Sequence, residues 1–124
     1  MSDNAVKHDG LVVKIIDEHR LVLNKGARDG VSDGDKFVVF SLGEEIHDPK
    51  TGESLGILED IKGKGKVIHV QDLMCTIETY EFDMEPVSIN KAFRWATPFY
   101  VKETEKVYRE FVDVELGDYV RKIK

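Results

Sequence analysis

Short apolar runs, separated by polar and glycine-rich stretches, recur along the whole chain. Runs of about four to eight apolar residues bounded by turn-forming residues are typical of β-strands. The runs that predict strands cover residues 11–16, 21–23, 37–40, 55–58, 66–70, 74–80 and 119–123. The pattern therefore predicts an all-β fold, a small closed or partly open β-barrel of about six to seven strands.

The run Phe37-Val-Val-Phe40 is continuous instead of alternating. A strand of this kind needs cover on both of its faces. The barrel core supplies one cover, and an added element of the chain or a second copy supplies the other. This run is therefore compatible with a homo-oligomer.

The segment before this run contains several glycines and ends in the pair Gly34-Asp35. The same pair of residues occurs again as Gly117-Asp118, before the last predicted strand. Glycine supplies the positive φ angles of tight turns, and an adjoining aspartate accepts hydrogen bonds from turn amides. We therefore expect both aspartates to fasten turns, not to act as a general acid and base.

Two further connections are predicted between strands. Residues 43–54 are expected to form a long loop, with its turn at Asp48-Pro-Lys-Thr-Gly52 because proline favours the second position of a turn. The segment Lys62-Gly-Lys-Gly-Lys66 is expected to form the tip of a hairpin.

Most of the aromatic residues lie in the segment from 81 to 115, which we expect to be an insertion before the closing strand. Apolar residues near helical spacing predict a helix over residues 98–112. The insertion either covers one end of the barrel, because aromatic side chains mostly bury, or presents a surface to a partner. On the second interpretation, the partner-binding residues are Phe93, Trp95, Phe99 and Tyr100.

Composition narrows the choice of function. The 124 residues fit one domain, and a formal net charge of −6 repels nucleic acid and anionic membranes at long range. The single cysteine, Cys75, excludes an internal disulfide and is expected to be a small buried apolar residue. No segment approaches the ~18 apolar residues of a membrane span. We therefore expect a soluble chain, cytoplasmic unless a signal peptide has been removed.

Candidate chemical groups are scattered. The four histidines lack the paired spacing of metal ligands, and the acidic residues of the 43–54 loop do not follow the calcium-loop pattern. The histidines are His8, His19, His47 and His69. We expect Asp48 and Thr51 to hold the turn through hydrogen bonds to backbone amides. No nucleophile motif or nucleotide fingerprint occurs, so we expect no enzyme activity, no catalytic residue, no metal and no cofactor.

Lys62, Lys64 and Lys66 form the one concentrated basic spot in the sequence. Such a spot can contact a phosphate or an acidic partner, and small barrels often bind nucleic acid. A solvated tip is the simpler interpretation, because lysines commonly protect exposed β-structure from pairing.

Several turn motifs occur in an order that resembles a known family. They are Asn24-Lys-Gly26, Asp29-Gly-Val31, Gly34-Asp-Lys-Phe37, Ile46-His-Asp-Pro-Lys-Thr-Gly-Glu53 with Leu55-Gly56, and Gly117-Asp-Tyr-Val120. This order resembles the C-terminal domain of the flagellar assembly protein T family over roughly residues 10–80 and the last strand. The resemblance implies a compact β-barrel used in assembly, with no catalytic residues to carry over.

The sequence as a whole predicts a non-enzymatic protein-interaction or assembly module, which binds a protein partner or a second copy of itself. The alternative is a nucleic-acid or phosphate-binding barrel that uses Lys62, Lys64 and Lys66.

Overall fold

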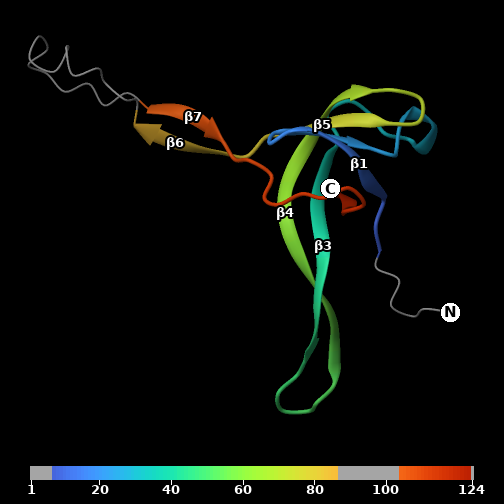
Figure 1. Ribbon diagram of the computed structural model, residues 1–124, viewed down its shortest axis with the longest axis vertical. Helices are drawn as coiled ribbons and strands as arrows, with labels where there is room; N and C mark the ends of the chain where they lie inside the picture. The colour runs from blue at the N-terminus through green and yellow to red at the C-terminus, as the bar shows by residue number, and fades with distance from the viewer. Residues whose placement is uncertain (1–6, 87–103, 124) are drawn as a thin grey trace, which may run out of the picture.

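The computed structural model describes residues 7–86 and 104–123, and the regular secondary structure in them is almost entirely β-strand (Figure 1). The strands are β1 (Gly10–Asp17), β2 (Arg20–Leu23), β3 (Lys36–His47), β4 (Ser54–Val70), β5 (Cys75–Thr79), β6 (Phe82–Pro86), β7 (Thr104–Tyr108) and β8 (Tyr119–Ile123). Six of them close an antiparallel barrel in the order β1-β2-β5-β4-β3-β8, and β6 and β7 form a separate sheet. The predicted β-barrel is confirmed. The one helical element described, a short 3₁₀ turn at Ala27–Asp29, is too short to cross a membrane.

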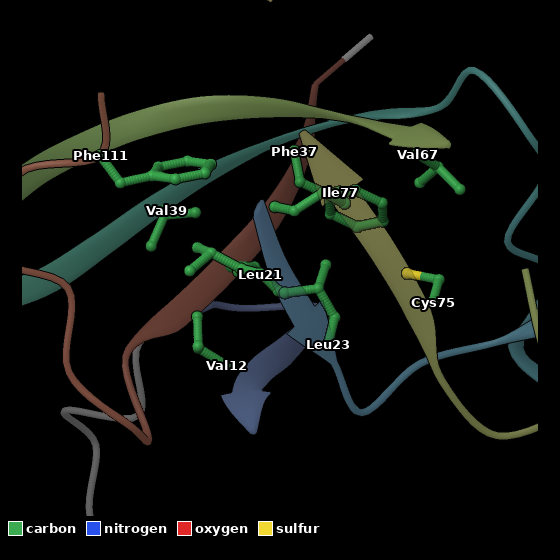
Figure 2. Close-up of a cluster of buried hydrophobic side chains, with 10 residues drawn as sticks. Val12, Leu21, Leu23, Phe37, Val39, Val67, Cys75, Ile77 and Phe111 are labelled. Atoms are coloured by element: carbon green, nitrogen blue, oxygen red, sulfur yellow. The ribbon is translucent and has the colours of Figure 1, made fainter. Parts of the chain in front are cut away.

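The barrel interior is filled by side chains at alternate positions of its strands (Figure 2). Residues two apart on a strand face the same side, so each strand contributes one or two of them. The core consists of Val12, Leu21, Leu23, Phe37, Val39, Val67, Cys75, Ile77, Phe111 and Val120. The expectation that Cys75 is a small buried apolar residue is confirmed.

At Phe40, the outer face of the continuous run at the start of β3 is covered by side chains of the neighbouring barrel strand β8, where the sequence predicts an added element or a second copy. Phe37 and Val39 belong to the barrel core, whereas Phe40 lies outside that cluster and is still fully buried. The Phe40 ring stacks on Tyr119 with 5.7 Å between centroids, and the Arg121 guanidinium lies 4.7 Å from the Phe40 centroid. The outer cover of this strand therefore comes from β8.

The two Gly-Asp turns have the same geometry. Gly34 and Gly117 each have a φ of 89°, in the left-handed region that favours glycine. Each following aspartate accepts a hydrogen bond from the amide three residues earlier, at 2.9 Å for Asp35 and 2.8 Å for Asp118. The prediction that these aspartates fasten turn amides is confirmed.

The connection between β3 and β4 is shorter than predicted. Both strands continue into the expected loop of residues 43–54, which leaves a tight turn between His47 and Ser54. In that turn Asp48 Oδ1 accepts a hydrogen bond from Lys50 N at 2.7 Å, and Thr51 Oγ1 accepts one from Glu53 N at 3.2 Å. The expected roles of Asp48 and Thr51 are confirmed, whereas the long loop is wrong.

The segment Lys62–Lys66 is not a hairpin tip. It lies within β4 and pairs with β3, so the predicted strands 55–58 and 66–70 are parts of one long strand. Its glycines make room for packing: a Cβ on Gly63 would lie 2.6 Å from Cδ1 of Phe111. Glycine is common in turns and at close approaches of the backbone, and the sequence pattern does not separate the two.

β4 carries one extra residue, Lys62, where the barrel ends. Val39 pairs with Gly63 and Phe40 pairs with Ile61, so Lys62 has no cross-strand partner in β3. A bulge of this kind bends the strand and increases its twist. Gly63, with a φ of 147°, brings the backbone close to the Phe111 ring, which fills this end of the barrel core.

β6 and β7 form a two-stranded ribbon that projects from the barrel (Figure 1). The predicted helix over residues 98–112 is wrong at Thr104–Tyr108, which is strand, and residues 98–103 lie outside the described part of the chain. Phe82 and Tyr108 face each other across the ribbon with 5.7 Å between ring centroids. Arg109 binds Asp83 at 2.8 Å. These cross-strand pairs outweigh the helical spacing of the apolar residues.

Replacing Gly63 with alanine is expected to lower the free energy of unfolding by about 2–3 kcal/mol. The added methyl group would clash with the Phe111 ring, and the positive φ is unfavourable for alanine. Urea denaturation of the two proteins measures the difference.

Gly43→Ala is the matched control, because the nearest atom to a Cβ there belongs to the flexible carboxylate of Asp60. It should cost less than about 1 kcal/mol. Combining Gly63→Ala with Phe111→Ala should give a loss smaller than the sum of the single losses. If the two losses of stability add fully, Gly63 and Phe111 do not pack against each other.

Candidate interaction surface

Beyond Phe40 and Ile61, β3 and β4 leave the barrel as a two-stranded ribbon, the hairpin arm (residues 41–60; Figure 1). β8 pairs with β3 only over Lys36–Phe40, and β5 pairs with β4 only over Gly65–Val70. Within residues 7–86 and 104–123, no third strand pairs with the arm, so both of its backbone edges are open. An isolated two-stranded hairpin is at best marginally stable in water.

Large apolar side chains are exposed on β4 along the arm and at its base. Leu55 is 66% exposed, Leu58 47% and Ile61 56%. Single exposed apolar residues are ordinary, but three on one strand with an open edge leave apolar side chains available for contact with another molecule.

The arm is strongly acidic, with six carboxylates and one lysine. The carboxylates belong to Glu44, Glu45, Asp48, Glu53, Glu59 and Asp60, and the lysine is Lys50. At the base of the arm, Arg121 Nη2 lies 2.6 Å from Glu59 Oε2, and this guanidinium holds the pKa of Glu59 below its usual range. The same arginine covers Phe40, so it ties the arm to β8.

The three predicted phosphate-contact lysines do not form a free basic patch. Lys62 Nζ binds Asp118 Oδ2 at 2.9 Å and the Asp113 carbonyl at 2.8 Å. The side chain of Lys62 is only 14% exposed, and that of Asp118 only 8%. Lys64 Nζ lies 4.0 Å from Glu81 Oε2, and Lys66 is exposed on the barrel wall. Lys62 therefore serves the fold.

The predicted partner-binding aromatic residues, Phe93, Trp95, Phe99 and Tyr100, lie outside the described residues. The sequence pattern does not distinguish the hairpin arm from the barrel. Residues 55–58 predict a barrel strand, because an apolar run predicts a strand without showing how many neighbours that strand has. The available signal was the density of acidic residues on both sides of this run.

The histidines and carboxylates do not assemble into a metal site in the described residues, where no three potential ligand side chains converge. His19 Nε2 lies 3.3 Å from the Tyr108 carbonyl, and His47 lies 3.6 Å from Glu45 in the arm. His69 is exposed on β4.

A cleft of about 610 Å³ separates the β1–β2 turn from β7. Its lining includes Asp17, Arg20, Glu78 and Tyr108. Arg20 is bound to Asp17 at 2.6 Å, and this hydrogen bond lowers the pKa of Asp17.

Compared with known proteins, the chain matches no protein-family model and no curated sequence.

Replacing Lys62 with methionine is expected to lower the free energy of unfolding by about 2–4 kcal/mol. The substitution leaves the carboxylate of Asp118 buried without its cationic partner. Urea denaturation measures the loss.

Lys66→Met is the control and should change stability by less than about 0.5 kcal/mol, because Lys66 is exposed. Adding Asp118→Asn to Lys62→Met should restore part of the loss. Equal effects of Lys62→Met and Lys66→Met would contradict a structural role for Lys62.

The Cys75 thiol is expected to resist alkylation in the folded protein. Burial raises its pKa to about 11, so little thiolate forms at pH 8, and the side chain is inaccessible. Mass spectrometry after treatment with iodoacetamide should show unmodified native protein and full modification in guanidinium chloride. Rapid modification of native protein would show that the core opens at this strand.

Proposed function

We propose that this chain is a non-enzymatic protein-interaction or assembly module whose main contact element is the hairpin arm. One observation carries the proposal: the arm extends beyond the barrel with exposed leucine side chains and two backbone edges that pair with no other strand in the described part of the chain. Isolated hairpins of this kind gain stability when another element packs on them or pairs with them. The barrel provides the rigid base that holds the arm in position.

The order of turn motifs supports the same role, because it resembles the C-terminal barrel of the flagellar assembly protein T family. The proposal includes that family resemblance and a cytoplasmic location. It also includes a second contact surface, formed by Phe93, Trp95, Phe99 and Tyr100. The partner on this proposal is another protein or a second copy of the chain.

The alternative, a nucleic-acid or phosphate site at Lys62, Lys64 and Lys66, has less support. Lys62 is held by Asp118 and Lys64 lies near Glu81, so both charges are at least partly neutralised. The negative net charge of the chain also opposes binding to a polyanion.

The double substitution Leu55→Ser/Leu58→Ser is expected to abolish partner capture and leave the barrel intact. Both side chains are exposed, so the free energy of unfolding should change by less than about 0.5 kcal/mol. Affinity capture from the native host, with quantitative mass spectrometry, should show at least about a tenfold loss of the main partner.

Leu73→Ser/Leu116→Ser is the matched control, because these leucines are 57% and 66% exposed outside the arm. Trp95→Ala, measured alongside, tests the second contact surface. If the arm variant and the control capture the same proteins in the same amounts, the arm is not the contact element. Loss of the partner with Trp95→Ala alone would assign the contact to the aromatic residues instead.

A further inference from the structure

The hairpin arm lacks lysine and proline on its strands, and its edges carry acidic side chains and two register shifts. Natural edge strands commonly carry lysine or proline, or are covered by another element. Among residues 41–60, Lys50 and Pro49 both lie in the turn, and the two strands carry neither residue. The unpaired N–H and C=O groups of the arm are therefore available to an added strand.

Charge selects the occupant of these edges. A second copy would bring its own six carboxylates against those of the first, and like charges facing each other destabilise a strand pair. Nucleic acid is repelled for the same reason. A positively charged segment is attracted, since Glu44 and Glu53 are exposed and form no ion pair in the described residues.

The apolar side chains add a second requirement. Leu58 is 47% exposed on β4, and Ile46 and Ile57 are half-buried. Side chains along a strand alternate between faces, so an added strand must present apolar side chains beside these residues as well as cationic ones. A purely cationic chain would satisfy the charge and leave the leucine in water.

We propose that the hairpin arm binds an extended segment of another protein that is rich in both basic and β-branched apolar residues, and that this segment adds to an open edge as a third strand. The inference rests on the interaction role proposed above and names the chemistry of the partner. Main-chain hydrogen bonds supply affinity in such an addition, and side-chain contacts supply specificity.

The test uses the full chain and a fluorescent synthetic peptide of about nine residues that alternates lysine and valine, a typical strand length. Fluorescence anisotropy should show binding that weakens by about tenfold or more as salt rises from low to molar concentration, because salt screens exposed charges. Hydrogen exchange should slow at amides of the arm when the peptide binds. A peptide that alternates glutamate and valine should not bind.

The Glu44→Lys/Glu53→Lys variant should bind the cationic peptide about tenfold more weakly or worse. Asp33→Lys/Asp72→Lys makes the same change in net charge at exposed aspartates outside the arm, and it should retain most of the affinity. If both variants lose affinity for the peptide equally, the binding depends only on net charge, and the inference is overturned. Equal binding of a peptide of lysine alone, or no protection of the arm amides, would also overturn it.

This outcome is separable from the test of the interaction role. If the Leu55→Ser/Leu58→Ser variant loses its partner but cross-linking shows a second copy or an acidic segment on the arm, the interaction role holds and the inference fails. If the leucine variant loses nothing, the interaction role itself fails.

Discussion

The extra residue that β4 carries at Lys62 is the constraint on which the rest of the structure depends. On one side of it, β3 and β4 belong to a closed barrel. On the other side they continue as a ribbon that pairs with no further strand among residues 7–86 and 104–123. The bulge also directs the Lys62 ammonium to Asp118 and brings Gly63 under the Phe111 ring. The end of the barrel, the turn before β8 and the base of the hairpin arm therefore meet at this position, and each limits how the others can move.

The barrel and the arm have opposite surface character, which follows from this arrangement. Inside the barrel, apolar side chains are buried, and the six strands pair around a closed ring. In the arm, leucine side chains are exposed among six acidic residues. A rigid base with a pre-ordered strand edge lowers the total entropy lost on binding, because only the partner must become ordered.

Much of the barrel could be predicted from the sequence, since local signals specify it. The turns at Gly34-Asp35 and Gly117-Asp118, and the strand Tyr119–Ile123, require only residues near one another in the chain. The strand structure of the Lys62–Lys66 segment could not be predicted from local signals. Gly63 is needed there because its backbone packs against Phe111, which is distant in the sequence. The arm could not be predicted for a related reason: an apolar strand has the same sequence pattern whether it pairs with two neighbouring strands or with one. Its acidic residues gave the only local sign.

The closing of the barrel through β8 has a consequence for how the protein is made. β1 begins the barrel and pairs with β8 at Gly10 and Val120, about 110 residues apart, and β3 pairs with the same strand. During synthesis on a ribosome, the edges of β1 and β3 stay without their partner until residues 119–123 have emerged. Barrel closure is thus a late, long-range step, of the kind that slows folding and leaves nascent strands open to wrong pairing. The single five-residue strand β8 pairs with both β1 and β3 and so closes the barrel.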